Sequence, residues 1–386
     1  MRIGIIGGAL QGIEAVFLSN KAGFETVVID RKENAPALSL SDSHEVLDVT
    51  KDAERAKKIL WDCDAVIPAC EEIEALTALD RMMQGSEVPF LFDLEAYGIS
   101  SSKKRSNEIM EEIGIPLPRP WPECGFPAVV KPSSQSGSIG VSAVNNEKEM
   151  DAALRTVEEL GDVPVAQEFV SGKSVSIEVI GKRGSATSFQ TTEVVLDSNY
   201  DCKMVLCEPD ILPKEDDELF ADIGRRIAEA VDLNGLMDVE AIYTKNGLRV
   251  LETDARIPSQ TPAAVWAATD INILEELAYS ALGKTTGREN RNECSSYEHY
   301  LVENGRLITC GEKVFGKISK PRFEERFFGS DEAITNYLPG KEVWRATVIT
   351  KGKTAAEVLR KRKEFIYRTM NECDLEEYVD RSPRMV

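Results

Sequence analysis

The sequence predicts an α/β protein whose first part is a doubly wound, Rossmann-like domain. An apolar run at 2–6 is typical of a buried parallel strand, and a glycine-rich turn follows at 7–12. Residues 11–22 have a helical pattern that ends at Gly23, and a second apolar strand follows at 26–29. A strand, a turn, a helix and another strand in this order form a β-α-β unit, from which such domains are built.

The rest of the chain divides into two further expected domains. The first domain covers residues 1–95. A proline-rich connector at 116–127 lies in a central α/β domain, residues 96–282, whose residues 127–182 form a lid subdomain. A small α+β domain is expected at 283–386. The remaining expected elements are strands at 65–67, 89–92 and near 343–350, and helices at 71–83, 101–113, 147–160 and 354–371.

Composition narrows the class of function. The 386 residues include 66 acidic and 46 basic side chains, which gives a formal charge of −20. The electrostatic field of this negative charge repels nucleic acid and anionic membranes, so we expect neither as a partner. The sequence has no apolar run of membrane-spanning length and no signal peptide, so a cytoplasmic location is expected. With only two histidines, chemistry based on charge and positioning is favoured over histidine catalysis.

The turn at Gly7 resembles a dinucleotide-binding fingerprint only in part. Gly7 and Gly12 fit its first and sixth positions, but Ala9 fills the third, where glycine lets a pyrophosphate approach the backbone. Asp30 stands where a ribose-binding acid would. Such turns also serve only to pack a helix on a strand, so a nicotinamide site is disfavoured. A substrate or nucleotide site near Leu10, Gln11 and Asp30 stays open.

A strand-borne lysine next to a loop of small residues indicates a phosphate site. Lys131 follows the apolar run 126–130, and Gly137 and Gly140 then let backbone amides turn toward an anion. Ser138 and its neighbours add hydroxyl donors. An ordinary hairpin is the alternative, but the lysine favours phosphate binding. The loop is not a Walker loop, because the lysine precedes the glycines.

A strand at 165–170 carries Glu168 into a turn. The Glu168 carboxylate could accept a hydrogen bond from an adenine amino group, while the backbone near Val170 hydrogen-bonds to the adenine ring. An exposed glutamate at a strand end is the plainer interpretation of this segment alone.

Two acidic strands joined by Asn-Gly predict a hairpin with a cluster of carboxylates. Asn246 and Gly247 separate two alternating apolar runs. Period-two alternation places Asp238 and Glu240 on one face of the first strand, and Glu252 and Asp254 on one face of the second. Like charges in one place need a cation between them, and hard oxygen ligands beside phosphates suit Mg²⁺. A solvated hairpin face is the alternative.

These motifs, in this order, resemble the ATP-grasp superfamily over about residues 1–282. The helix opened by Lys103, the strand lysine with its loop, the adenine strand and two metal carboxylates twelve residues apart carry the likeness. Within it, the chain is similar to the pyrrolysine-biosynthesis ligase family. The segments that carry this closer likeness are 8–12, 192–197, 200–203, 251–262 and 311–316.

The resemblance implies an ATP-grasp architecture for the central domain and a role for each matching residue. It implies an ATP-dependent carboxylate–amine ligase that joins (3R)-3-methyl-D-ornithine, or ornithine, to the ε-amine of L-lysine through an acyl phosphate. Mg²⁺, or Mn²⁺ in its place, would be the metal, and a homodimer is compatible with the likeness. The implied ATP-binding residues are Lys103, Lys131, Ser138, Glu168, Phe169, Val170 and Leu251, and the metal ligands are Glu240, Glu252 and Asp254.

Roles in catalysis and substrate binding are assigned from position in the chain and from side-chain chemistry. Arg256 would steady the acyl phosphate and the oxyanion, Lys131 the transferred phosphate, and Asp238 the attacking amine. The candidate substrate-binding residues are Leu10, Gln11, Asp30, Glu71, Glu72, Glu178, Asp238, Arg256 and Ser259. Three departures from the family pattern stand out: Ser102 in place of an acid, Lys173 near the usual ribose-binding glutamate, and Asp254 in place of asparagine.

Two other functions remain as alternatives at this point. Another ATP-grasp ligase or carboxylase would share the ATP-handling hairpin but take different substrates. A nicotinamide-dependent oxidoreductase would use the Gly7 turn, although it would leave the acidic hairpin unexplained.

Overall fold

The computed structural model describes residues 1–135, 137 and 139–383. The chain forms two compact units, each built from separate stretches of sequence. The first unit contains Met1–Leu94, Gln190–Ile211 and Arg256–Val386, and the second contains Glu95–Phe189 and Leu212–Ala255. The division of the chain into three domains stays a prediction.

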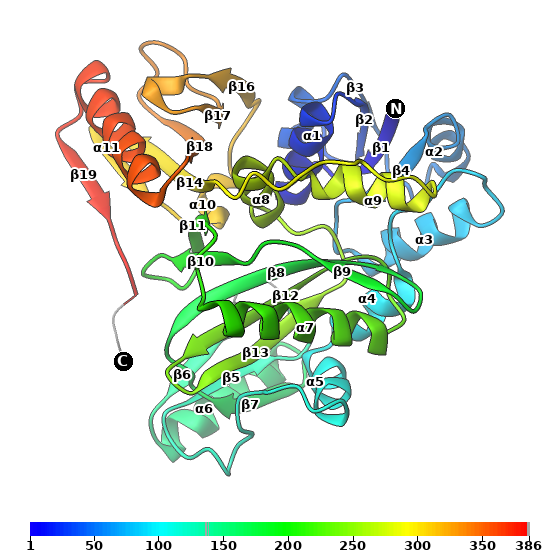
Figure 1. The fold of residues 1–386 in the computed structure, drawn as a ribbon, viewed down its shortest axis with the longest axis vertical. Helices are drawn as coiled ribbons and strands as arrows, with labels where there is room; N and C mark the ends of the chain where they lie inside the picture. The colour runs from blue at the N-terminus through cyan, green and yellow to red at the C-terminus, as the bar shows by residue number, and fades with distance from the viewer. Residues whose placement is uncertain (136, 138, 384–386) are drawn as a thin grey trace. The chain divides into compact units, whose positions relative to one another are not determined.

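The first unit begins with the expected doubly wound sheet, which is parallel and has the strand order β3-β2-β1-β4 (Figure 1). Three of its strands, at 2–6, 25–30 and 65–68, form where the sequence has short apolar runs, and most of their side chains are buried. The edge strand at 43–46 is polar, and none of its side chains is fully buried. The expected strand at 89–92 is present only as an isolated parallel bridge between Phe90 and Val66. The strands are β1 (Arg2–Ile6), β2 (Glu25–Asp30), β3 (Ser43–Val46) and β4 (Ala65–Pro68), and the helices are α1 (Leu10–Lys21), η1 (Pro36–Ser39), α2 (Ala53–Leu60) and α3 (Ile73–Met83).

The rest of the first unit is a mainly antiparallel sheet with the order β10-β11-β14-β18-β17-β16; β15 also pairs with β14, and β19 pairs in parallel with β15. A long helix, α11 (Ala355–Glu372), covers one face of this sheet and buries Tyr300, Trp344 and Phe365 (Figure 1). The strands are β10 (Thr192–Leu196), β11 (Cys202–Cys207), β14 (Cys294–Glu303), β15 (Arg306–Thr309), β16 (Arg322–Glu325), β17 (Glu332–Thr335), β18 (Trp344–Gly352) and β19 (Glu377–Asp380). The other helices are α8 (Thr261–Thr269), α9 (Ile273–Ala281), α10 (Glu312–Phe315) and η2 (Phe327–Gly329).

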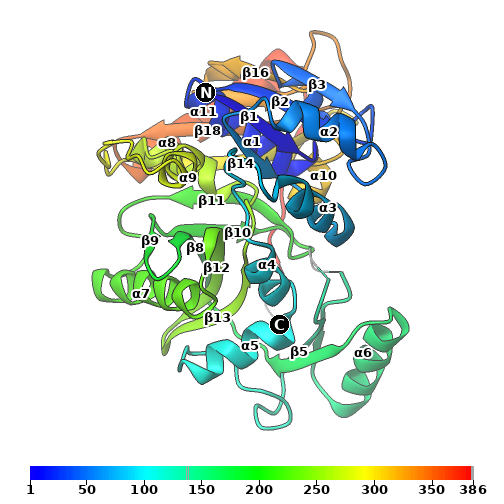
Figure 2. The same cartoon turned by 90° about the vertical axis from the view of Figure 1, so that its right-hand side faces the viewer.

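The second unit contains an antiparallel run of strands, β13-β12-β8, with the short β9 beside β8, and a separate three-stranded sheet, β6-β5-β7. The helix α7 (Lys214–Ala230) packs on one face of β8 and β12, and α6 (Glu147–Glu159) packs on the three-stranded sheet (Figures 1 and 2). The strands are β5 (Ala128–Pro132), β6 (Ser142–Val144), β7 (Pro164–Glu168), β8 (Lys173–Lys182), β9 (Ala186–Ser188), β12 (Asn234–Thr244) and β13 (Gly247–Asp254). Two helices, α4 (Leu94–Ser100) and α5 (Lys103–Glu112), precede them.

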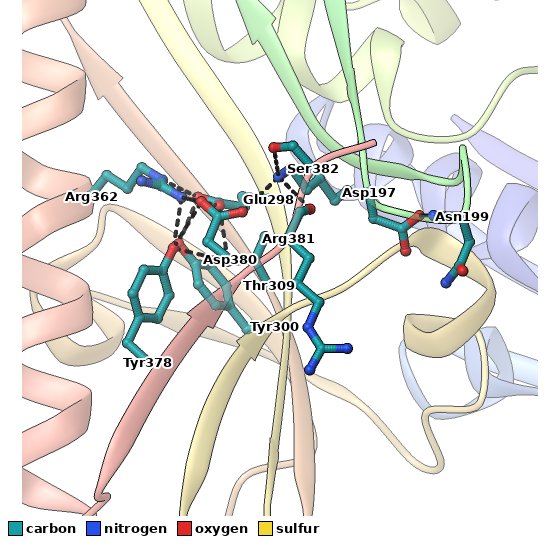
Figure 3. Close-up of polar contacts among 11 residues, drawn as sticks. Asp197, Asn199, Glu298, Tyr300, Thr309, Arg362, Tyr378, Asp380, Arg381 and Ser382 are labelled. Carbon is teal, nitrogen blue, oxygen red and sulfur yellow. Dashed lines mark hydrogen bonds and ion pairs between the residues drawn. The ribbon is translucent and has the colours of Figure 1, made fainter. Parts of the chain in front are cut away.

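A partly buried polar network ties the last strand of the chain to the first unit's second sheet (Figure 3). Glu298 on β14 accepts two hydrogen bonds from Arg362 on α11, at 2.6 and 2.7 Å. Lys203 on β11 donates to the Asp380 carboxylate at 2.6 Å, and to Arg381 O and Ser382 Oγ beyond β19. The network therefore fixes the positions of β19, Arg381 and Ser382.

None of the helices in the described part of the chain combines the length and the apolar character that a bilayer crossing requires.

Candidate active site

The acidic hairpin has the register that the alternation predicts. β12 pairs with β13 so that Asp238 lies opposite Asp254 and Glu240 lies opposite Glu252. Because opposite residues of a pair share a face, the four carboxylates lie on one side of the hairpin. The predicted clustering of these side chains on one face is confirmed.

A third strand extends this acidic face. β8 pairs with the other edge of β12, and Glu178 lies opposite Asp238. Two rows therefore cross the three strands, one with Glu178, Asp238 and Asp254, and one with Ser176, Glu240 and Glu252. Glu178 and Asp238 are almost completely buried. A carboxylate is rarely buried without a charged or hydrogen-bonding partner, so this face is built for polar groups.

The opposite face of the same strands is apolar, which explains why the acids all point one way. Val175, Ile177 and Val179 on β8 alternate with the polar positions and are buried, as is Val239 on β12. The buried stripe of α7 packs against this face. The alternation of side chains along a strand therefore sends every second residue into the core and the others to the acidic face.

Two lysines lie beside the acidic face. The ammonium of Lys103, the first residue of α5, lies 2.9 Å from Glu252 Oε2 and donates to Gln135 O. Lys131 Nζ on β5 donates to Leu251 O at 3.0 Å. Burial lowers the pKa of Lys131, and Glu252 offsets part of that effect. Burial also acts to lower the pKa of Lys103, but Glu252, together with Asp254 and Glu240, outweighs it and raises that pKa.

The beginning of α5 is held by the loop that follows Lys131. Ser102 is the N-cap of α5, and its hydroxyl accepts a hydrogen bond from Arg105 N. Ser133 O accepts from Lys103 N, and Ser133 Oγ accepts from Lys104 N. A serine at position 102 therefore has a clear structural role. Ser138, the predicted phosphate-loop residue, lies outside the described residues.

Glu168, at the end of β7, has a partner that the sequence did not suggest. Arg119 Nε and Nη2 each donate to the Glu168 carboxylate at 3.2 Å, and this pairing lowers the pKa of Glu168. The backbones of the two residues also bond, with Glu168 N donating to Arg119 O at 2.8 Å. Phe169 and Val170 follow directly, and Phe169 N donates to Pro127 O. The adenine-binding role of this segment stays a prediction.

The carboxylates fit Mg²⁺ as partial ligands and do not form a complete protein cage. No three acidic, histidine or cysteine side chains converge as a metal-binding group among the residues that the structure describes. Mg²⁺ is usually held by one or two carboxylates together with water and substrate phosphates, so a complete cage is not required. Glu240 lies opposite Glu252, with Asp254 in the next row, and these are the carboxylates that would hold such an ion.

Two of the predicted substrate residues, Gln11 and Arg256, meet at a third, Glu71. Arg256 Nε donates to Glu71 Oε1 at 3.0 Å, and Gln11 Nε2 donates to the same oxygen at 2.8 Å. The neighbouring Glu72 instead pairs with Arg31 at 3.0 Å in a more exposed position. A guanidinium, an amide and a carboxylate from three distant parts of the sequence therefore form one polar cluster.

Asp30 shapes the glycine-rich turn. Its two carboxylate oxygens accept from Gly8 N and Lys32 N, both at 2.7 Å. A Cβ at Gly12 would collide with Gly7 O, so the turn lets α1 begin close to the backbone of β1. The geometry supports packing of the helix on the strand, with Leu10 and Gln11 placed at the start of α1.

Comparison with known proteins agrees with this fold and site. A model of the ATP-grasp domain matches residues 100–260. A solved N5-carboxyaminoimidazole ribonucleotide synthetase with ADP superposes with a TM-score of 0.71 over 96% of this chain and 97% of its own, at 18% identity. A biotin carboxylase from Campylobacter jejuni superposes with a TM-score of 0.73 over 95% of this chain and 91% of its own, at 15% identity. The fold and the paired lysines and carboxylates define an ATP-grasp enzyme.

Curated ligases are more similar in sequence than these two solved structures are. The 3-methyl-D-ornithine–L-lysine ligase of Methanosarcina acetivorans is 36% identical over 370 residues, which is 93% of this chain and 97% of that protein. Its counterpart from Methanosarcina mazei is 37% identical over 313 residues, 80% of this chain and 81% of that protein. The chain belongs to this family of ligases, and it is an ATP-dependent carboxylate–amine ligase. The oxidoreductase alternative is thereby set aside.

Proposed function

We propose that the protein uses ATP to join the carboxylate of 3-methyl-D-ornithine to the ε-amine of L-lysine, giving 3-methylornithyl-N6-lysine for pyrrolysine biosynthesis. The observation that carries this proposal is the 36% identity across 97% of the length of a ligase with these two substrates in its name. The arrangement of charges in both units supports it.

The first step activates the carboxylate. A carboxylate oxygen attacks the γ-phosphorus of ATP, and ADP leaves, so that an acyl phosphate forms. Lys103 and Lys131 are our candidates for neutralising charge on the transferring phosphate, and their positions beside the acidic hairpin support this role. A bound Mg²⁺, or Mn²⁺, held by Glu240, Glu252 and Asp254 would add positive charge at the phosphates.

The second step forms the amide. The neutral ε-amine of lysine attacks the acyl carbon, phosphate leaves, and the amine gives up its extra proton. Arg256 is our candidate for binding the oxyanion, because its fork of donors fits paired oxygens. Asp238 and Glu178, opposite each other on β12 and β8, are candidates for holding a substrate ammonium or accepting the proton.

The cluster around Glu71 is our candidate for binding an amino-acid substrate. Its carboxylate already gathers cationic and amide donors. An ammonium group could replace them, while Leu10, Glu72 and Ser259 supply further contacts. Asp30 would act indirectly, through the turn that it shapes.

The test is a measurement of ADP release with ATP, Mg²⁺, L-lysine and either enantiomer of ornithine, followed by mass analysis of the product. We expect ADP release that depends on both amino acids and a product with the mass of their amide. Release with a different acid–amine pair, and none with these two, would replace this proposal with another ATP-grasp ligase or carboxylase. Sedimentation of the same sample would decide between a monomer and the homodimer that the family likeness allows.

A further inference from the structure

The segment Gly311–Gly316 belongs to the sequence that resembles the ligase family, yet the mechanism above gives it no role. It contains the short helix α10, which lies in the first unit far from Arg256 in the sequence. We infer that Glu312 is a positioning residue that holds the turn 256–260, and with it Arg256 and Ser259, for substrate binding. The consequence for substrate binding rests on the proposed function, and the contact itself does not.

The contact joins one carboxylate oxygen to two side chains of the turn. Ser259 Oγ donates to Glu312 Oε2 at 3.0 Å, and Gln260 Nε2 donates to the same oxygen at 2.7 Å. Hydrogen bonds to a charged acceptor are stronger than those between neutral groups. Glu312 therefore fixes the positions of both side chains at once.

The turn needs such support, because its backbone is strained. Gln260 has a φ of +79°, which residues other than glycine rarely adopt, and it is buried. Such conformations persist where the surroundings hold them in place. The other end of the Gln260 amide is also engaged, since its Oε1 accepts from Cys202 Sγ at 3.0 Å.

The first turn of α8, which follows the turn 256–260, is also held by a side chain from another helix. Gln260 occupies the N-cap position of α8, but its side chain makes no capping hydrogen bond. The buried Glu14 on α1 accepts from Ala263 N at 2.7 Å and takes over that function. Glu14 and Glu312 thus hold the start of α8 from two different elements.

A movement at 259–260 would reach Arg256 directly. Only three residues separate Arg256 from Gln260, and the two of them at 257 and 258 are buried. One of these is Pro258, whose ring fixes φ, so this short link cannot easily absorb a shift. The turn and Arg256 therefore move as one piece.

Glu312 is itself fixed in position. Asp201 accepts from Lys313 N at 3.0 Å, and a Cβ at Gly311 would collide with the Asp201 carboxylate. At the other end of α10, Arg345 Nε donates to Val314 O at 2.8 Å. This explains why the segment needs glycine at 311 and why the short helix can serve as a rigid support.

Kinetics and hydrogen exchange on the full-length protein test the inference, with the variants Glu312→Ala, Glu312→Gln and Lys313→Ala. Glu312→Ala leaves Ser259 and Gln260 without their acceptor, so we expect an increase of about ten- to a hundredfold in the KM of an amino-acid substrate. The KM for ATP should be unchanged. Glu312→Gln keeps one carbonyl acceptor and should recover most of the loss. Lys313→Ala is the matched control, because only the Lys313 backbone takes part.

Hydrogen exchange separates this inference from the proposed function. Glu312→Ala should speed exchange of the amides at 259–264 and leave α11 unchanged, whether or not the two amino acids are the substrates. Unchanged exchange in 259–264 would overturn the positioning role. Faster exchange with an unchanged KM for every amino acid that supports turnover would overturn the link to substrate binding. If the wild-type protein shows no turnover with the two proposed amino acids, only the proposed substrates are overturned.

Discussion

The ammonium of Lys103 lies 2.9 Å from the carboxylate of Glu252, although the two residues are 149 positions apart in the sequence. Lys103 begins α5, and Glu252 lies on β13 opposite Glu240. Glu252 therefore has a cationic partner at the place where we propose that Mg²⁺ binds. The pair brings a candidate phosphate-binding lysine and a candidate metal-binding carboxylate into direct contact.

We expect Glu252→Gln to raise the Mg²⁺ concentration needed for half-maximal turnover by about tenfold or more, because a neutral amide binds a hard cation more weakly. The measurement is ADP release as a function of Mg²⁺ concentration. Asp254→Asn is the comparison variant, since asparagine is common at that place in the superfamily and should be tolerated better. An unchanged Mg²⁺ dependence in Glu252→Gln would remove Glu252 from the ligand set.

Arg256→Ala should abolish amide formation far more than it weakens ATP binding. Arg256 is paired with Glu71 and is our candidate for stabilising the oxyanion, a contribution worth about 3–4 kcal/mol for a single donor. Product formation by mass analysis and ATP affinity by calorimetry measure the two effects separately. Arg31→Ala, which breaks the neighbouring exposed pair with Glu72, is the control. Equal losses in both measurements, or no loss in either, would argue against the role of Arg256.

His299 should make the protein less stable as the pH falls below 6.5. The ring is fully buried, bonds to Thr347 Oγ1 through Nδ1 at 2.7 Å and stacks on Phe315, and burial lowers its pKa to about 3. Between the folded value and the unfolded value of about 6.5, the unfolded chain binds the extra proton. The free energy of unfolding therefore decreases as the pH falls through this window, by about 3 kcal/mol at pH 4 from this residue alone.

Urea unfolding of His299→Gln and His44→Gln between pH 4 and 7 measures this effect. His44 is exposed, so His44→Gln should keep the wild-type pH dependence. His299→Gln has no proton to bind there, so its stability should change less with pH. The same slope in all three proteins would mean that His299 does not contribute.

Arg362→Met should lower the free energy of unfolding by about 3–5 kcal/mol, because it leaves the buried Glu298 without its cation. Urea unfolding at neutral pH measures the loss. Arg360→Met, on the exposed side of the same helix, should cost much less. Adding Glu298→Gln to Arg362→Met removes the uncompensated charge and should restore part of the stability. No recovery in the double variant would mean that Arg362 acts through packing.

Ser102 shows that one apparent departure from the family had a local explanation in the sequence. A serine three positions before an amide that needs an acceptor is a common N-cap, and the structure gives Ser102 this role. The same kind of rule placed the hairpin turn at Asn246-Gly247 and the four carboxylates on one face. Both rules depend only on near neighbours in the chain.

Arg119 and Glu312 could not be assigned in the same way. Glu168 is 49 residues from Arg119, and Ser259 is 53 residues from Glu312. No local pattern marks either partner, because the pairing depends on which elements the fold brings together. The helix α4 was missed for a related reason: its seven residues are too few for a clear periodic pattern.

The sequence by itself determined the β-α-β unit at the start of the chain, the acidic face of the hairpin and the candidate phosphate lysines. These follow from side-chain alternation and turn chemistry, which act over a few residues. Only the tertiary structure decided that Lys103 pairs with Glu252, that Arg256 and Gln11 share Glu71, and that Glu312 supports the turn before α8. Those contacts join segments far apart in the chain, and they form only where burial of the apolar faces brings the segments together.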